Sequence, residues 1–208
     1  KPSNQAKKMR IVKWMWTIFV AIGLIGVFSL LLIYNGVIGY MPPIEELKNP
    51  HDKFASIIYA NDGTTELGRY YSGMGNRVYA DYDDISTHMI DALIATEDVR
   101  FNDHSGIDFK ALGRAAVKTI LMGDRSSGGG STITQQLAKQ LYSKPSSNIF
   151  DRAMQKPIEW MIAIKLERFY TKDEIIKMYL NRFDFLNNAV GIKTAAKVYF
   201  NKDAKDLS

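Results

Sequence analysis

The sequence predicts a mainly α-helical protein with an N-terminal transmembrane helix and a small β-hairpin region. Three observations support this fold class. Residues 14–44 contain no charged side chain, residues 54–83 carry β-branched and aromatic runs around an Asp-Gly turn, and residues 84–208 place apolar side chains at helical spacing. Of the 208 residues, 46% are hydrophobic and 24% are charged, which is typical of a globular protein rather than a disordered one.

The positive charge of the chain is concentrated at its N-terminus. Residues 1–13 carry five basic side chains and no acidic one, whereas residues 45–208 hold 22 basic and 22 acidic side chains. The net charge of +5 therefore comes from this basic tail, and no nucleic-acid-binding face is expected. The absence of cysteine excludes disulfide bonds, thiolate nucleophiles and cysteine-based metal sites.

Residues 14–34 are predicted to form a single transmembrane signal-anchor helix. A helix of this length spans roughly 30 Å, which matches the hydrocarbon core of a bilayer. Trp14, Trp16 and Tyr34 lie near its two ends, where amphipathic rings prefer the membrane interface. The basic tail places the N-terminus in the cytoplasm, with the rest of the chain outside the cytoplasmic (inner) membrane. A cleaved signal peptide and a buried core helix are the alternatives, but the first has a shorter apolar region and the second rarely lacks charge for so long.

Residues 35–53 are expected to be a linker, and residues 54–83 a small β region. Pro42 and Pro43 interrupt the helix at its exit from the membrane. The apolar run at 54–60 is followed by Asn61-Asp62-Gly63 and by further aromatic runs, which is strand and turn chemistry. This pattern predicts a hairpin or a three-stranded piece.

Residues 84–208 are predicted to be helical. The expected helices comprise one ending near Glu97, one over 109–122, one that Ser131 can cap and that runs to about Tyr142, one over 151–170, one opened by a capping box of Thr171 and Glu174, and one over 191–200. The glycine-rich loop at 123–130 is either a ligand-approaching loop or a mobile linker.

Four stretches of this helical region carry polar or charged groups suited to chemistry. Residues 97–108 are dense in ionisable groups after an apolar helix, so a desolvated carboxylate there can act as a general base. The alternative is a solvated loop. Residues 128–139 combine a glycine-rich approach with a Ser/Thr-capped helix start, which can bind an anion or simply cap the helix. Lys156 and Glu159 share a helix face and also fit a surface ion pair. Residues 175–181 fit core packing.

Together these stretches resemble the motifs of a known family. EDVRFNDHSGID (97–108), GGSTITQQLAK (129–139), QKPIE (155–159), IIKMYLN (175–181) and AAKVYFNKDAKDLS (195–208) are similar, in order and spacing, to the motifs of the peptidoglycan glycosyltransferases. These enzymes are the lipid II polymerases found as monofunctional glycosyltransferases and in class A penicillin-binding proteins. The resemblance covers roughly residues 54–208.

The resemblance implies a fold, a reaction and a localisation. The fold is lysozyme-like, with a helical head lobe and a smaller, membrane-apposed jaw lobe, and the glycosyltransferase domain occupies residues 84–208. The reaction transfers a growing glycan from undecaprenyl diphosphate to the 4-hydroxyl of a lipid II sugar with inversion. The implied partners are lipid II, the growing glycan strand, membrane lipid and proteins of the cell-wall synthesis machinery. A divalent cation such as Mg²⁺, bound with the substrate diphosphate, is the expected cofactor, and no tight protein metal site is expected.

The resemblance also implies which residues act. Glu97 matches the catalytic glutamate that serves as the general base, and Glu159 matches the second functional glutamate. The matched substrate-binding positions are Asp98, Arg100, Phe101, His104, Gly130, Ser131, Thr132, Gln135, Gln136, Lys139, Arg152, Lys156 and Asn181.

Three departures from the family pattern stand out. Gln155 replaces an arginine before Lys156, which removes one positive charge. The interval between Lys139 and Lys156 is longer than usual, so Arg152 is the nearest counterpart of the arginine in that interval. Asn201 replaces a glycine, and asparagine tolerates left-handed backbone well. The family domain normally continues past Ser208, so a C-terminally truncated domain is expected, and no Ser-x-x-Lys transpeptidase motif is present.

Two other functions remain open from the sequence. A muramidase-like glycan hydrolase would share the fold but needs an acid for a sugar leaving group. A non-catalytic membrane scaffold of the cell-wall machinery is the second alternative, and the presence of both glutamates argues against it.

Overall fold

The computed structural model describes residues 4–48, 56–70, 77–122, 129–143 and 148–208. The described elements are α1 (Asn4–Tyr34), α2 (Ile44–Lys48), β1 (Ser56–Tyr59), β2 (Glu66–Tyr70), α3 (Thr87–Glu97), α4 (Phe109–Met122), α5 (Ile133–Tyr142), α6 (Ile149–Phe169), α7 (Lys172–Arg182) and α8 (Ile192–Phe200), with short 3₁₀ turns at 82–84, 101–103 and 204–206. The mainly helical fold class with one small β region is confirmed.

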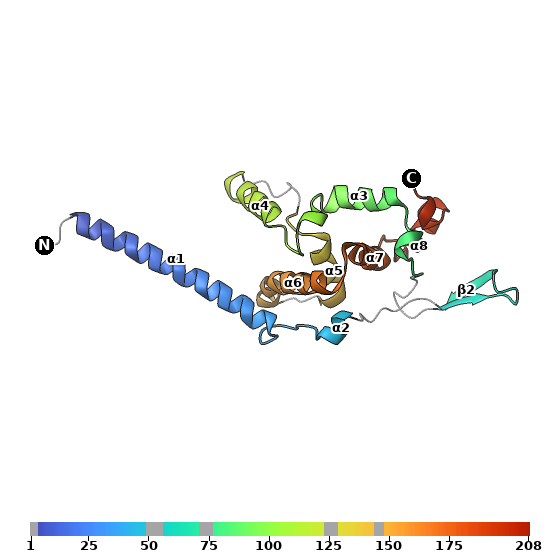
Figure 1. Ribbon diagram of the computed structural model, residues 1–208, viewed down its shortest axis with the longest axis horizontal. Helices are drawn as coiled ribbons and strands as arrows, with labels where there is room; N and C mark the ends of the chain where they lie inside the picture. The colour runs from blue at the N-terminus through green and yellow to red at the C-terminus, as the bar shows by residue number, and fades with distance from the viewer. Residues whose placement is uncertain (1–3, 49–55, 71–76, 123–128, 144–147) are drawn as a thin grey trace.

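Helix α1 extends as a long rod away from the helical body (Figure 1). Residues 7–34 are long and apolar enough to cross a membrane: an 18-residue stretch within them has a mean hydropathy of 2.5, and only 6% of that stretch is buried. Among the described residues, most of this helix is therefore not packed into a core. The helix begins at Asn4, ten residues before the predicted start at Trp14, because the basic tail continues it.

The last turn of α1 is attached to α6. Ile33 is buried, the Lys165 ammonium donates a hydrogen bond to the Tyr34 carbonyl oxygen at 3.1 Å, and the Arg168 guanidinium donates to the Tyr34 hydroxyl at 3.2 Å. The Lys165 ammonium also lies 4.5 Å from the centre of the Tyr34 ring. These contacts fix the direction in which α1 leaves the body.

Strands β1 and β2 form an antiparallel hairpin, which lies away from α1 in Figure 1. Its turn is held by Asp62, whose carboxylate accepts the backbone N–H groups of Thr64 and Thr65 at 3.0 and 2.9 Å. Residues 77–81 form no strand, so the described residues show the predicted hairpin rather than a three-stranded piece.

Helix α5 lies at the centre of the body and packs against α6 and α7 (Figure 1). Its apolar face is fully buried at Ile133, Leu137 and Ala138. The same core contains side chains from α3, α6, α7 and α8, including Leu93, Leu166, Leu180 and Ala196. Because this face is packed into the core, α5 is held rigidly and so are the polar side chains that it carries.

Helix boundaries agree closely with the sequence pattern in most places. The capping box of Thr171 and Glu174 is present at the start of α7. The predicted cap of α5 was wrong by one residue, because Thr132 rather than Ser131 accepts the backbone N–H of Gln135, at 3.1 Å. Asn201 ends α8 in the left-handed conformation (φ 51°, ψ 33°), as the sequence predicted for this position.

Candidate active site

Glu97 is the last residue of α3, and its side chain is exposed. The helix ends there because Asp98 takes a non-helical conformation (φ −157°, ψ 72°). Across a short gap, the Gln136 side-chain amide of α5 donates a hydrogen bond to Glu97 Oε2 at 2.7 Å. A carboxylate that is solvent-accessible yet held by a neutral donor is a suitable general base.

Asp98 points the opposite way, into the protein. Its carboxylate is 3.0 Å from His104 Nε2, and both side chains are nearly buried, with 4% and 7% exposed. It also accepts the backbone N–H of Ile133 at 3.1 Å, at the start of α5. Asp98 and His104 therefore join the loop between α3 and α4, residues 98–108 and called the motif loop below, to α5. Direct substrate contact by these two residues stays a prediction.

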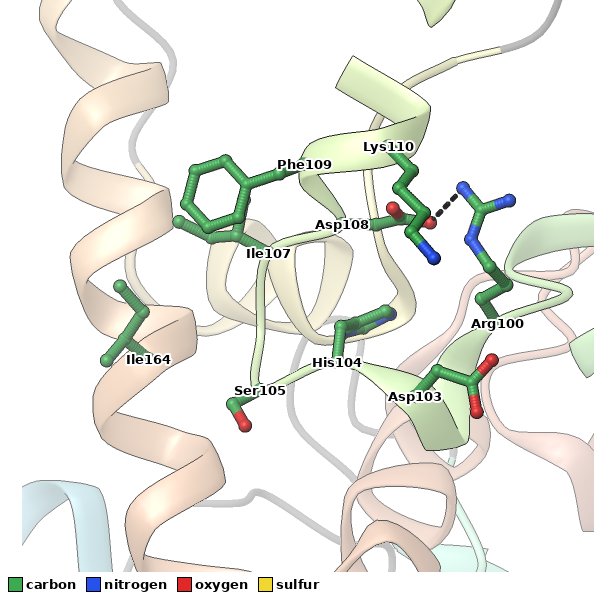
Figure 2. Close-up of a pocket in the computed structure, with 9 residues that line it drawn as sticks. All are labelled: Arg100, Asp103, His104, Ser105, Ile107, Asp108, Phe109, Lys110 and Ile164. Atoms are coloured by element: carbon green, nitrogen blue, oxygen red, sulfur yellow. Dashed lines mark hydrogen bonds and ion pairs between the residues drawn. The ribbon is translucent and has the colours of Figure 1, made fainter. Parts of the chain in front are cut away.

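Arg100 forms an ion pair with Asp108 at 2.6 Å, which Figure 2 shows as the dashed line. Burial alone would raise the pKa of Asp108. Hydrogen bonds from the Ala111 N–H and from Arg100 outweigh this effect, so the pKa lies below its ordinary value. Figure 2 also shows Ile107 and Phe109 facing Ile164 of α6 across a hollow of about 360 Å³.

The segment before α5 makes close backbone contacts. The Thr132 hydroxyl donates to the Gly106 carbonyl oxygen at 2.8 Å, and the Gln135 amide donates to the same oxygen at 3.2 Å. Both side chains are about 1% exposed. A Cβ on Gly130 would lie 3.1 Å from Leu112 of α4, so glycine allows the two segments to approach. Residues 123–128 of the predicted glycine-rich loop lie outside the described residues.

A polar cluster lies where α6 approaches the segment before α5; it consists of Ser131, Lys156 and Glu159. The Lys156 ammonium donates to the Ser131 hydroxyl at 2.9 Å and pairs with Glu159 Oε2 at 3.0 Å. The Glu159 side chain is only 3% exposed, whereas that of Lys156 is 52% exposed. The Ser143 hydroxyl lies 3.3 Å from Glu159 Oε1. Glu159 is therefore a buried anchor that holds an accessible cation, rather than part of a surface ion pair.

A narrow groove of about 40 Å³ lies between the 97–108 segment, α4 and the residues before α5. The groove is lined by residues of the motif loop, α4 and the α5 approach, namely Glu97, Asp98, Val99, Arg100, Asp108, Ala111, Arg114, Gly129, Gly130, Ser131 and Thr132. Glu97 and Ser131 thus share one groove, and Lys156 reaches it through Ser131. Lys139 is exposed on α5. Arg152 lies in α6, but its side chain is outside the described residues.

Phe101 and Asn181, two further predicted substrate-binding residues, also lie in the interior. Phe101 is fully buried, with the Lys172 ammonium 4.2 Å from the centre of its ring. Asn181 is 2% exposed; its amide donates to the Ala80 carbonyl oxygen and accepts the Ala80 N–H, both at 2.8 Å. Their described contacts are structural, so substrate contact by either side chain stays a prediction.

Sequence analysis missed several polar residues that support the site. Glu167 accepts hydrogen bonds from Thr134 at 2.6 Å and Lys172 at 2.8 Å, and Lys172 also donates to the His104 carbonyl oxygen at 2.7 Å. Arg114, which lines the groove, was also missed. Their helical spacing resembles that of ordinary surface charges, so only the tertiary fold distinguishes them.

Over the described ranges, no three His, Asp or Glu side chains gather closely enough to hold a metal ion. Glu159, the buried carboxylate of the cluster, is already paired with Lys156.

Comparison with known proteins identifies the family. The transglycosylase family matches residues 64–208 of the chain. The chain belongs to the transglycosylase family. The resemblance seen in the five motifs is thereby confirmed, and so is the lysozyme-like fold that it implied. The transglycosylase match includes the hairpin strand β2, the groove and every predicted site residue.

Relatives of this transglycosylase chain are penicillin-binding proteins. Penicillin-binding protein 1A of Escherichia coli (strain K12) is 36% identical over 200 residues, which cover 96% of this chain and 23% of that protein. Penicillin-binding protein 1F of Bacillus subtilis (strain 168) is 44% identical over 133 residues, covering 64% and 18%. Penicillin-binding protein 1A of Aquifex aeolicus (strain VF5) is 36% identical over 196 residues, covering 91% and 26%. The chain spans about a quarter or less of these relatives.

Proposed function

We propose that this chain carries the glycan-polymerising activity of a membrane-anchored peptidoglycan glycosyltransferase. The substrates are lipid II and the growing glycan strand on undecaprenyl diphosphate. One observation carries the proposal: an accessible carboxylate, Glu97, shares a groove with Ser131, to which the Lys156 cation is hydrogen-bonded. Transfer from a diphosphate is helped by a base for the acceptor hydroxyl and by a cation for the leaving group.

The proposed reaction uses Glu97 as the general base. The 4-hydroxyl of the lipid II acceptor attacks the anomeric carbon of the donor sugar, and Glu97 takes up the hydroxyl proton. The new glycosidic C–O bond forms as the bond to the diphosphate oxygen breaks. The anomeric centre inverts, and undecaprenyl diphosphate leaves with the electron pair.

The proposed role of the cluster of Ser131, Lys156 and Glu159 is to stabilise the leaving diphosphate. Negative charge develops on the bridging oxygen, and a fixed cation lowers the barrier most where water is excluded. The Lys156 side chain is exposed enough to contact the diphosphate, and its ion pair with Glu159 holds the ammonium in position. The exposed cations Lys139 and Arg114 are further candidates for phosphate contact. Mg²⁺ is proposed to bind together with the diphosphate of the substrate, because phosphate oxygens are ligands that Mg²⁺ prefers.

The proposed localisation is the cytoplasmic membrane. The basic tail would remain in the cytoplasm, α1 would cross the bilayer once, and the helical body would lie outside the cytoplasm. The length, apolar composition and exposure of α1 support this orientation together with the positive charge that precedes it.

A polymerisation assay tests the proposal. The purified chain in detergent is incubated with labelled lipid II and Mg²⁺, and the products are separated by size. We expect polymer from the wild type, at least about 100-fold less from Glu97→Gln, and unchanged polymer from Glu45→Gln, which alters an exposed carboxylate on α2. Shortening of finished glycan strands would favour the hydrolase. A wild type that neither builds nor shortens glycan would favour the scaffold.

A further inference from the structure

The Glu97 side chain has room to leave its position. A hollow of about 220 Å³ lies beside it, between α3 and α7, and is lined mostly by apolar and aromatic side chains, among them Met89, Leu93, Phe183 and Phe185. Glu97 ends its helix and has three rotatable side-chain bonds. Without a constraint its carboxylate could rotate between the groove and this hollow.

The Gln136 side chain restrains the Glu97 carboxylate, but the orientation of the Gln136 amide must itself be fixed. Its amide donates to Glu97 Oε2 at 2.7 Å only in one of two orientations. In the flipped orientation Gln136 Oε1 would face the carboxylate, and two acceptors would repel each other. Some other group must therefore decide which way this amide points.

Tyr179 of α7 fixes the orientation of the Gln136 amide. Its hydroxyl donates a hydrogen bond to Gln136 Oε1 at 3.0 Å. Burial and the nearby charge of Glu97 raise the pKa of Tyr179 to about 12, so the hydroxyl keeps its proton at neutral pH. The Tyr179 side chain is 2% exposed, and its ring packs on Phe183 with the centroids 5.4 Å apart. The donor is thus fixed by the core of the protein.

We propose that Tyr179 is a positioning residue that holds the Glu97 carboxylate in the groove through the amide of Gln136. This inference rests on the proposed function, because it concerns the base of that reaction. Tyr179 does not contact the reacting atoms. It determines which face of Gln136 meets Glu97 and therefore whether the carboxylate points toward the acceptor hydroxyl or into the hollow.

The substitution Tyr179→Phe tests the inference because it removes the hydroxyl and keeps the ring. We expect kcat for lipid II polymerisation to fall at least about 10-fold while KM changes less than about twofold, because only the base is misplaced. Tyr170→Phe is the matched control. It removes a hydroxyl that donates to the Leu47 carbonyl oxygen, remote from Glu97, and should leave kcat unchanged.

A double substitution separates positioning from general damage to the fold. In a Gln136→Met background the connection to Glu97 is already broken, so adding Tyr179→Phe should lower kcat by less than about twofold. An equal loss of activity in both backgrounds would overturn the inference. Equal kcat values for Tyr179→Phe and Tyr170→Phe would overturn it as well.

An NMR measurement at one pH keeps the inference testable even if the proposed function fails. The ¹³C signal of the Glu97 carboxyl carbon, assigned with Glu97→Gln, is recorded at pH 7 in the wild type, in Tyr179→Phe and in Tyr170→Phe. A carboxylate that loses an oriented N–H donor changes its chemical shift. We therefore expect the signal to move in Tyr179→Phe and to keep its position in Tyr170→Phe.

The NMR measurement and the polymerisation assay test different claims. An unchanged Glu97 signal in Tyr179→Phe would overturn the role of Tyr179 whether or not the chain polymerises lipid II. A wild type without polymerising activity would contradict the proposed function, while a displaced Glu97 signal would still support the connection from Tyr179 to Glu97.

Discussion

The Asp98 carboxylate accepts the backbone N–H of Ile133 at 3.1 Å while pairing with His104 at 3.0 Å. One buried side chain thus connects the loop that follows Glu97 to the first turn of α5. Because Gln136 lies on the next turn of the same helix, the distance between Glu97 and Gln136 depends on this connection. Asp98 acts on the site by fixing the relative position of two elements.

Replacing Asp98 should destabilise the fold strongly. Asp98→Ala leaves the Ile133 N–H without its acceptor and His104 without its partner, at a cost of about 3 kcal/mol in the free energy of unfolding. Urea unfolding of the full chain measures this loss. Asp103→Ala, which removes an exposed carboxylate of the same loop, is the control and should change stability by less than about 0.5 kcal/mol. Equal effects of the two substitutions would contradict the prediction.

Gly106 is expected to tolerate no side chain. Its φ is +91°, and a Cβ would lie 2.8 Å from the Ala163 carbonyl carbon of α6. Gly106→Ala should therefore cost at least about 2 kcal/mol of unfolding free energy and displace the carbonyl that Thr132 and Gln135 share. Gly113→Ala is the matched control, because it has open space within α4 and should stabilise by about 0.5–1 kcal/mol. Thermal unfolding of both variants decides the matter.

Asn181 offers a test of structural against substrate-binding roles. Asn181→Ala leaves the N–H and carbonyl groups of Ala80 without partners, so we expect a loss of about 2 kcal/mol in stability. KM for lipid II should stay within about twofold of the wild type at a temperature where the variant is folded. A large rise in KM with unchanged stability would instead support direct substrate contact. Asn102→Ala, at an exposed position, should alter neither quantity.

The hairpin turn should weaken in acid. Hydrogen bonds from Thr65 and Thr64 to Asp62 lower the pKa of this carboxyl to about 2, below its ordinary value of 3.8. Because the folded pKa is depressed, its stabilising effect is complete above pH 4 and is lost as the pH falls from about 4 to about 2. The amide proton shifts of Thr64 and Thr65 should report a midpoint near 2. A midpoint near 3.8 would contradict the turn geometry, and Asp62→Asn should abolish the transition.

Local patterns predicted most helices because the relevant signals lie close together in sequence. The Thr171–Glu174 capping box and the left-handed Asn201 are decided within a few residues, and both appear in the fold. Ser131 and Thr132 are adjacent hydroxyls with similar capping propensity. Which of them caps α5 is decided by distant partners, since Lys156 binds Ser131 and the Gly106 carbonyl binds Thr132.

The candidate site was predictable to a similar extent. Motif resemblance named Glu97, Gln136, Lys156 and Glu159. The fold joins the first two by a hydrogen bond and the last two by an ion pair. It could not show that Phe101 and Asn181 lie in the interior, because a motif records which residues occur together and not what they touch. Tyr179 was interpreted as core packing, and the bond of its hydroxyl to Gln136 appears only when α5 and α7 are packed.

Helix α6 carries two lysines that contact different parts of the protein. Lys156 lies near the groove, and Lys165, nine residues later, holds the carbonyl oxygen of Tyr34 at the end of α1. At 1.5 Å per residue, these two lysines are about 14 Å apart along the helix axis. If α1 crosses a bilayer, α6 acts as a fixed spacer that sets the height of the groove above the lipid headgroups. A carrier lipid could then present its diphosphate to Lys156 without leaving the membrane.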